Sequence, residues 1–209
     1  MTIACIGIGN VGFALANNLQ KKGHTVIVAS DNPNSESVQS ALQRNPEFSL
    51  NTIQNAVDRS DLTFLATPFF ANEEVLANVD FKGKILVDCT NPVGPVISHG
   101  LNNEISGSGK VQEWASTAKV IKAFTIYGFE NFINPSFPNY DVTPVMLIAG
   151  NDQASKTQFE PLVNDLGYMM KDVGGLDQAL HLEHMTLLWV KMVRKNGHHP
   201  HFVWAYLER

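Results

Sequence analysis

The sequence has 209 residues, of which 44% are hydrophobic and 17% are charged, a composition that suits a globular chain and argues against intrinsic disorder. The formal net charge is −5 and the longest basic run is Lys21-Lys22, so we do not expect nucleic acid as a partner. Two cysteines cannot form a disulfide framework, and no apolar run reaches the ~18 residues of a membrane span, so we expect a cytoplasmic protein without a membrane partner.

Strand-like and helix-like patterns alternate from the first residues onward. Thr2–Ile6 is a short β-rich run, and after a glycine cluster Val11–Lys22 repeats its apolar residues at helical spacing. Gly23 marks the end of that helix, and Thr25–Ala29 is a second β-rich run. A strand, a turn, a helix and a strand within about thirty residues predict a βαβ unit.

The alternation continues to the C-terminus. We expect further helices at 32–45, 52–59, 71–78, 111–118, 153–166 and 179–195. We expect strands at 48–50, 62–66, 84–88, 119–123, 145–149 and 168–172, and a last extended segment at 201–207. Two long loops, 93–109 and 124–143, follow strand ends, where ligands bind in such folds. The pattern predicts a doubly wound, mostly parallel α/β sheet of the Rossmann type, as one domain over residues 1–209 with a helical extension from about residue 176.

A Gly-x-Gly-x-x-Gly motif lies between the first predicted strand and the first predicted helix. It comprises Gly7, Gly9 and Gly12, with Asn10 and Val11 before the third glycine. The first glycine allows a sharp turn, the second lets the backbone approach a pyrophosphate, and the third lets the helix pack closely on the strand. The free N–H groups at the helix start would bind the phosphates. In this context the motif predicts a dinucleotide site rather than a glycine turn without a ligand.

The end of the second strand, Ser30-Asp31-Asn32, bears on which dinucleotide binds. An acid at this place usually binds the ribose 2′-OH of NAD, so Asp31 slightly favours NAD. Ser30 and Asn32 could instead bond the 2′-phosphate of NADP, although no arginine stands beside them. Asp31 could also be an ordinary helix cap or turn residue.

Several segments together resemble a known family. They are Ile6–Gly12, Gly23–Val26, Asp61–Pro68, Leu86–Val93, Val120–Thr125, Ile148–Asp152 and Leu166–Tyr168. Over nearly its whole length the chain resembles the NADPH-dependent reductases of the deazaflavin coenzyme, and it is similar to the cytosolic reductase domains of six-transmembrane ferric reductases. The resemblance implies NADP, with NAD as the alternative, and hydride transfer to a flavin-like acceptor. Two residues depart from the family: Asp31 stands in place of an arginine, and Thr125 in place of an asparagine.

The same resemblance places strand-end residues at the cofactor. They are Thr67, Pro68, Asn91, Pro92, Ala123 and Phe124. Simple turns at the two proline positions, and core packing of Phe124, are the alternative interpretations. Tyr127 and the loop 129–140 would line an acceptor pocket, or would fold on their own aromatic side chains.

No residue pattern indicates a particular catalytic or metal-binding group. The sequence shows no obvious acid–base pair or nucleophile motif, and Glu183 and His184 do not share a helix face. His198, His199 and His201 form a cluster that we expect to be solvated or packed. Hydride transfer between two rings needs alignment more than acid–base help, so an NAD(P)-dependent oxidoreductase is expected even so.

Two other functions stay open at this point. A dehydrogenase of small hydroxy acids would need a large helical second domain with a catalytic lysine, and Lys191 has no motif support. A non-catalytic NAD(P) sensor would need only the binding site. The helix at 179–195 carries more apolar residues than a solvent-facing helix needs, which predicts a homodimer interface.

Overall fold

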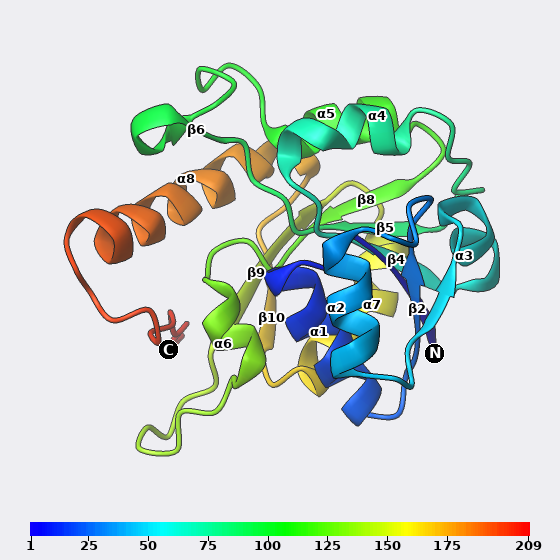
Figure 1. The fold of residues 1–209 in the computed structure, drawn as a ribbon. Helices are drawn as coiled ribbons and strands as arrows, with labels where there is room; N and C mark the ends of the chain where they lie inside the picture. The colour runs from blue at the N-terminus through cyan, green and yellow to red at the C-terminus, as the bar shows by residue number, and fades with distance from the viewer.

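A central sheet carries helices on both of its faces, as the computed structural model of residues 1–209 shows (Figure 1). The strands of this sheet are β1 (Thr2–Ile6), β2 (Thr25–Ala29), β3 (Ser49–Asn51), β4 (Leu62–Leu65), β5 (Ile85–Asp88), β8 (Lys119–Lys122), β9 (Val145–Gly150) and β10 (Met169–Asp172). The helices are α1 (Asn10–Lys21), α2 (Glu36–Arg44), α3 (Ile53–Arg59), α4 (Asn72–Leu76), α5 (Gly107–Trp114), α6 (Phe129–Ile133), α7 (Gln153–Asp165) and α8 (Ala179–Val190). A separate small hairpin pairs β6 (Val93–Gly94) with β7 (Ser98–His99).

The eight strands lie in the order β10-β9-β8-β5-β4-β1-β2-β3. Neighbouring strands are parallel except β8 and β9, which are antiparallel. The chain starts near the middle of the sheet, winds outward to β3 and then returns to build the other half. This is the doubly wound, mostly parallel architecture that the sequence predicts, so the predicted fold class is confirmed.

The two faces of the sheet bury two separate apolar cores. Along β1, Ile3 and Cys5 belong to the core that also contains residues of α1 and α7. Ala4 and Ile6 belong to the core shared with α3, α4 and α5. Successive side chains point to opposite faces of a strand, so a strand covered on both sides is apolar throughout.

Helix α2 begins at Glu36, later than the predicted start at residue 32. The Ser30 hydroxyl donates to the carbonyl of Asn32 at 3.1 Å, and the Ser35 N–H donates to the same carbonyl at 3.2 Å. These local bonds make a turn that competes with helix formation. Pro33 therefore lies in the turn and not in the first turn of the helix.

Both predicted long loops contain more structure than expected. The segment 93–109 holds the β6–β7 hairpin and the first residues of α5. The segment 124–143 holds α6, and its residues 124–127 are buried. Strands of two residues and helices of five are too short to show a periodic pattern in the sequence.

The last helix leaves the sheet and the chain then turns back toward α6 (Figure 1). Regular α-helix ends at Val190, and one π-helical turn, Lys191–Lys195, completes the predicted segment. The predicted extended tail forms no strand, but the Val145 N–H donates to the Trp204 carbonyl at 3.0 Å. None of the helices is both long enough and apolar enough to span a lipid bilayer.

Candidate functional site

The glycine motif forms the tight loop between β1 and α1. Gly7 has a φ of +84°, and a Cβ atom on it would lie 2.5 Å from the Thr67 nitrogen. A Cβ on Gly12 would lie 2.0 Å from the Gly7 carbonyl oxygen, whereas a Cβ on Gly9 would meet no protein atom within 4 Å. No side chain caps α1, so its first N–H groups are free to bind an anion. Two of the glycines are thus required by the protein itself, and the space above Gly9 is open.

A small cavity of about 160 Å³ lies beside this loop and reaches the end of β2. Its lining includes Ser30, Ser35 and Ser37, and no charged side chain. Asp31 is exposed, and its Oδ1 accepts a hydrogen bond of 3.0 Å from the Ile53 N–H at the start of α3. One oxygen of Asp31 is therefore already engaged by the protein.

A line of hydrogen bonds connects the ends of β4 and β5. The Thr67 hydroxyl donates to Asn72 Oδ1, and Asn72 Nδ2 donates to the Thr90 hydroxyl at 3.0 Å. The Thr90 hydroxyl in turn donates to Asp88 Oδ1 at 2.6 Å. Asn72, Thr90 and Asp88 are buried, so these bonds are shielded from competing water. They hold the loops after the two strands in a fixed relation to each other.

Asn91, at the end of β5, is held from two other elements. Its Oδ1 accepts a hydrogen bond from Thr125, just after β8, and lies 3.1 Å from the Thr186 hydroxyl on α8, which also lies 2.9 Å from the Thr125 carbonyl. The Nδ2 of the half-buried Asn91 has no acceptor within the protein, which leaves its N–H donors for a ligand. Thr125, one of the two departures from the family pattern, therefore has a clear structural role.

Beneath these strand ends lies a buried ionic network that the sequence did not reveal. Lys122 Nζ is 3.2 Å from Asp88 Oδ2 and 3.3 Å from Glu183 Oε1, and no more than 1% of these three side chains is exposed. Glu183 also accepts hydrogen bonds from Gly107 N and Ser108 N at the start of α5, at 3.0 and 3.2 Å. Burial opposes the charge of Lys122, but the two carboxylates outweigh it, and the pKa of Lys122 lies above its ordinary value.

Sequence reasoning missed this network because its members lie far apart along the chain. In the sequence Glu183 and His184 are only neighbours on one helix, whereas in the structure Glu183 points inward and contacts His99 Nε2 at 2.8 Å. The one available signal was a charged residue, Asp88 or Lys122, at the end of each of two apolar strands. A charge in such a place needs a buried partner.

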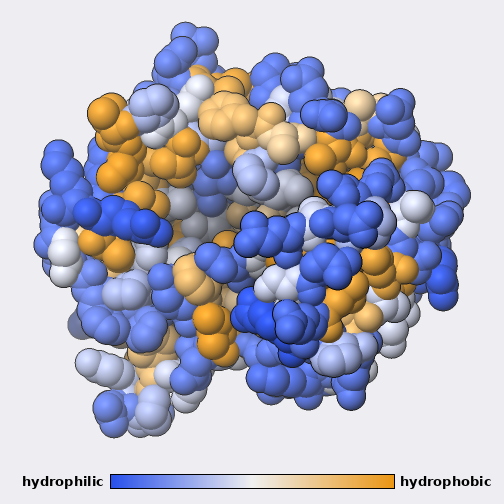
Figure 2. Space-filling model, viewed as in Figure 1, coloured by the Kyte–Doolittle hydropathy of each residue, from blue (hydrophilic) through white to orange (hydrophobic).

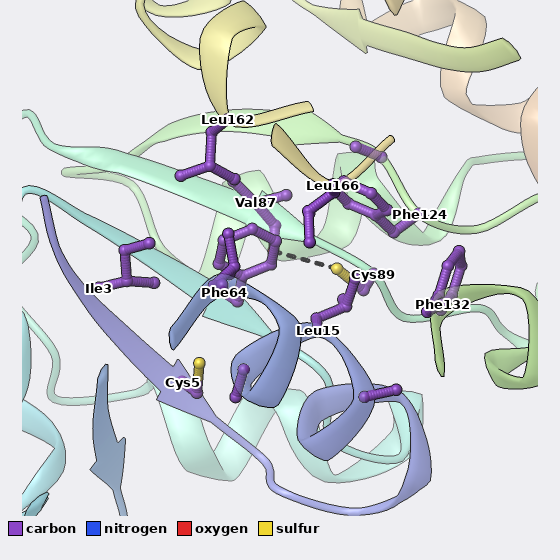
Figure 3. Packing of buried hydrophobic residues seen from close by; sticks show 14 of the residues in the cluster. Ile3, Cys5, Leu15, Phe64, Val87, Cys89, Phe124, Phe132, Leu162 and Leu166 are labelled. Atoms are coloured by element: carbon purple, nitrogen blue, oxygen red, sulfur yellow. Dashed lines mark hydrogen bonds between the residues drawn. The ribbon is translucent and has the colours of Figure 1, made fainter. Parts of the chain in front are cut away.

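Phe124 and Ala123 do not present their side chains to the site. Both are fully buried members of the core over α1 and α7, and Figure 3 shows the Phe124 ring among Phe132 and Leu166. Tyr127 is buried as well, with its hydroxyl donating to the Val145 carbonyl at 2.5 Å. These three side chains therefore pack in the core and do not line a pocket. Only the backbone at 123–124 could face a cofactor.

The other candidate residues considered from the sequence form no site of their own. The rings of His199 and His201 lie 4.7 Å apart, and no three His, Cys, Asp or Glu side chains are grouped in a way that could hold a metal ion. Cys5 and Cys89 are both buried, and desolvation raises the pKa of the Cys5 thiol to about 12. Buried, protonated thiols of this kind are poor nucleophiles.

Comparisons with known proteins agree with this geometry. Residues 2–92 match the model of the family described as NADP oxidoreductase, coenzyme F420-dependent. The fold is shared with a proposed F420-dependent NADP reductase of Arthrobacter sp. FB24, at 24% identity and a TM-score of 0.81 over the whole of both chains. No curated protein matches the sequence.

Two larger enzymes share the fold at lower identity. A 3-hydroxyisobutyrate dehydrogenase of Mycobacterium tuberculosis, solved with L-serine, is 15% identical at a TM-score of 0.65 over 92% of this chain and 62% of its own. A reductive aminase of Aspergillus terreus, solved with NADPH and ethyl-5-oxohexanoate, is 19% identical at a TM-score of 0.65 over 92% of this chain and 61% of its own. More than a third of each of these enzymes therefore has no counterpart here.

The matched residues include the glycine loop, Thr67 and Asn91, which the structure brings to one edge of the sheet. The resemblance to the deazaflavin-coenzyme reductases is thus confirmed over residues 2–92, and an NAD(P)-dependent oxidoreductase is the class of enzyme that this match supports.

Proposed function

We propose that this protein binds NADP(H) along the carboxyl edge of its sheet and transfers hydride between the nicotinamide and a flavin- or deazaflavin-like acceptor. The observation that carries the proposal is the open space above Gly9, next to the uncapped start of α1. The loop would hold the pyrophosphate there, with Asn10 and Val11 contributing backbone N–H groups. Thr67 and Pro68 would lie beside the bound dinucleotide.

The surroundings of Asp31 support NADP over NAD. The bond from the Ile53 N–H holds its carboxylate toward the start of α3, whose positive dipole end offsets part of the negative charge. The hydroxyls of Ser35 and Ser37 at the neighbouring cavity are suitable donors to a 2′-phosphate. Ser30 would join them by turning its hydroxyl away from the carbonyl of Asn32, which lies in the same turn. NAD is the alternative, in which the other oxygen of Asp31 binds the ribose.

Asn91 is the proposed partner of the nicotinamide carboxamide. Thr125 donates to its oxygen, so one of its two N–H groups would donate to the carboxamide oxygen. Pro92 would shape the same pocket with the backbone at 123–124. This arrangement would fix the plane of the ring and thereby the direction in which hydride leaves.

An exposed aromatic ring near these loops supports a planar acceptor. Phe70 is 66% exposed, and a Cβ atom on Gly100 would lie 2.8 Å from the tip of its ring. Gly100 N donates to the carbonyl of Pro92, so Phe70 lies over the loop that follows Asn91. Figure 2 shows apolar residues gathered in the upper part of this face, over α4, α5 and the β6 hairpin. A stacked ring system would cover such an exposed aromatic surface.

The homodimer stays a prediction, as does the cytoplasmic location. Much of the apolar surface of α8 packs within the chain, since Leu182, Leu187 and Trp189 are buried, while Leu188 is 50% exposed. A dimer would have to cover Leu188 with further surface from elsewhere. A monomeric mass by light scattering at micromolar concentration would contradict the dimer.

Titration with NADPH and with NADH, followed by nicotinamide fluorescence, tests the proposed cofactor. We expect NADPH to bind at least about tenfold more tightly than NADH, and Asp31→Arg to widen the difference by adding a partner for the 2′-phosphate. If the wild type instead binds NADH more tightly than NADPH, and Asp31→Arg reverses this preference, then Asp31 binds the ribose of NAD. Turnover of NADPH with deazaflavin, flavins or ferric chelates would then identify the acceptor, and absence of any turnover would leave only a binding function.

A further inference from the structure

The buried network at the ends of β5 and β8 carries an excess of negative charge. Asp88 and Glu183 are carboxylates, and Lys122 is the one ammonium group between them. Ser108 adds a neutral hydroxyl, which donates to Asp88 Oδ2 at 2.5 Å. With His99 neutral, two negative charges and one positive charge leave a net charge of −1.

The hydrogen bonds of His99 have the arrangement of a neutral ring. Its Nδ1 accepts from the N–H groups of Leu101 and Asn103, each at 3.3 Å, so Nδ1 carries no proton. The single ring proton is therefore on Nε2, which donates to Glu183 Oε2. The start of α5 offsets part of the excess, by about half a charge at most, because helix N-termini carry a partial positive charge.

This network contacts Thr90, the residue next to the proposed partner of the nicotinamide, Asn91. Lys122 Nζ donates to the carbonyl oxygen of Thr90, which is the peptide oxygen that precedes Asn91. Thr90 also bonds Asp88 through both its N–H and its hydroxyl. The network is almost fully buried, so water and salt screen its field weakly.

Hydride transfer changes the charge of the nicotinamide ring. When the C4–H bond of the reduced ring breaks, hydrogen leaves with the electron pair and the ring becomes a cation. The acceptor ring gains the hydride, and its new negative charge is taken up by a proton from water. A nearby negative charge therefore stabilises the oxidised cofactor relative to the reduced one.

We propose that the Asp88–Lys122–Glu183 network biases this site toward hydride donation, by favouring the cationic oxidised nicotinamide over the neutral reduced one. The inference rests on the proposed binding of NADP(H) at Asn91. It assigns Asp88 and Glu183 a role in shifting the equilibrium between bound NADPH and bound NADP⁺, without contact with the ring.

The test compares the dissociation constants of NADP⁺ and NADPH in variants that differ in buried charge. Glu183→Gln and Asp88→Asn each remove one negative charge and keep the shape of the side chain. We expect the ratio Kd(NADP⁺)/Kd(NADPH) to rise on the order of tenfold in each, as expected for one poorly screened charge near the ring. Rapid-mixing rates of NADPH oxidation should fall, and rates of NADP⁺ reduction should rise, in the same variants.

Two controls separate charge from structural damage. His99→Gln disturbs the same network but leaves its net charge at −1, so the ratio should stay within about twofold of the wild type. Glu113→Gln removes an exposed charge from α5 and should also leave the ratio unchanged. A substitution that only distorts the cofactor site would raise the Kd for NADP⁺ and the Kd for NADPH by the same factor, so their ratio would not change. If Glu183→Gln does not fold, Asp88→Asn decides the outcome.

An unchanged ratio in the charge-removing variants, or an equal change in His99→Gln, would overturn the inference. Failure of the wild type to bind either form of the cofactor is a different result, because it would overturn the proposed function itself.

Discussion

Lys122 on β8 and Glu183 on α8 form an ion pair with Nζ and Oε1 3.3 Å apart, and both side chains are almost entirely shielded from solvent. The pair connects the last helix to the centre of the sheet, next to the proposed nicotinamide site. Through Glu183 it also reaches the start of α5 and, through His99, the β6–β7 hairpin. Lys122 and Glu183 therefore link β8, α8, α5 and the β6–β7 hairpin at one buried place.

Loss of this cation should be costly for the fold. Lys122→Met would leave Asp88 and Glu183 facing each other without a counter-ion, and we expect the free energy of unfolding to fall by about 3–5 kcal/mol. Urea denaturation measures this change. The matched control is Lys119→Met on the same strand, because the pair of Lys119 with Asp152 is largely exposed and should contribute much less to stability. Equal effects of the two substitutions would contradict the importance of the buried pair.

Substitutions at two glycines of the loop should separate its contribution to folding from its contribution to cofactor binding. Gly12→Ala would place a Cβ against the Gly7 carbonyl, so we expect a loss of about 1–3 kcal/mol or more in stability. Gly9→Ala meets no protein atom and has a φ of −70°, so thermal unfolding should be unchanged. The same methyl group would occupy the space proposed for the pyrophosphate, and NADPH affinity should fall by about tenfold or more. Unchanged NADPH affinity in Gly9→Ala would remove the loop as the phosphate site.

Asp152 should make the stability of the protein sensitive to acid. The Ser155 hydroxyl and N–H, with Lys119, lower the pKa of this carboxyl to about 2. Because the folded pKa lies below the ordinary value near 4, the stabilising effect is complete above that value and is lost as the pH falls toward 2. We expect the Tm advantage of the wild type over Asp152→Ala to shrink across this range. Asp152→Asn keeps a capping oxygen but cannot titrate, so it should lack this part of the acid dependence.

Both cysteines should be inert in the folded protein. Burial raises the pKa of Cys5 to about 12, and burial with the neighbouring Asp88 raises the pKa of Cys89 well above its ordinary value. A thiol-specific reagent at pH 8 should label neither residue in the native state and both after unfolding. Rapid labelling of Cys89 in the native protein would show that the region around Asp88 opens readily. Labelling kinetics with and without NADPH would then report on that opening.

The βαβ start and the order of strands and helices could be predicted from the sequence because they depend on neighbours in the chain. β1 and β2 were predicted with the bounds they have, since apolar β-rich runs between glycine and polar segments are local signals. The geometry at Gly7 and Gly12 was predictable for the same reason. A sharp strand-to-helix turn needs residues without side chains, whatever the rest of the fold does.

Only the tertiary structure decided what faces the site. The Phe124 ring turns into the core because Phe64, Phe132 and Phe159 surround the place it fills, and no local pattern records that. Thr186 comes next to the oxygen of Asn91, and Lys122 pairs with Glu183, because α8 returns across the strand ends. The sequence alone determined the backbone frame, through local periodicity and glycine conformation. The side chains of the site were settled by contacts between segments far apart in the chain, which burial and charge pairing bring together only in the folded protein.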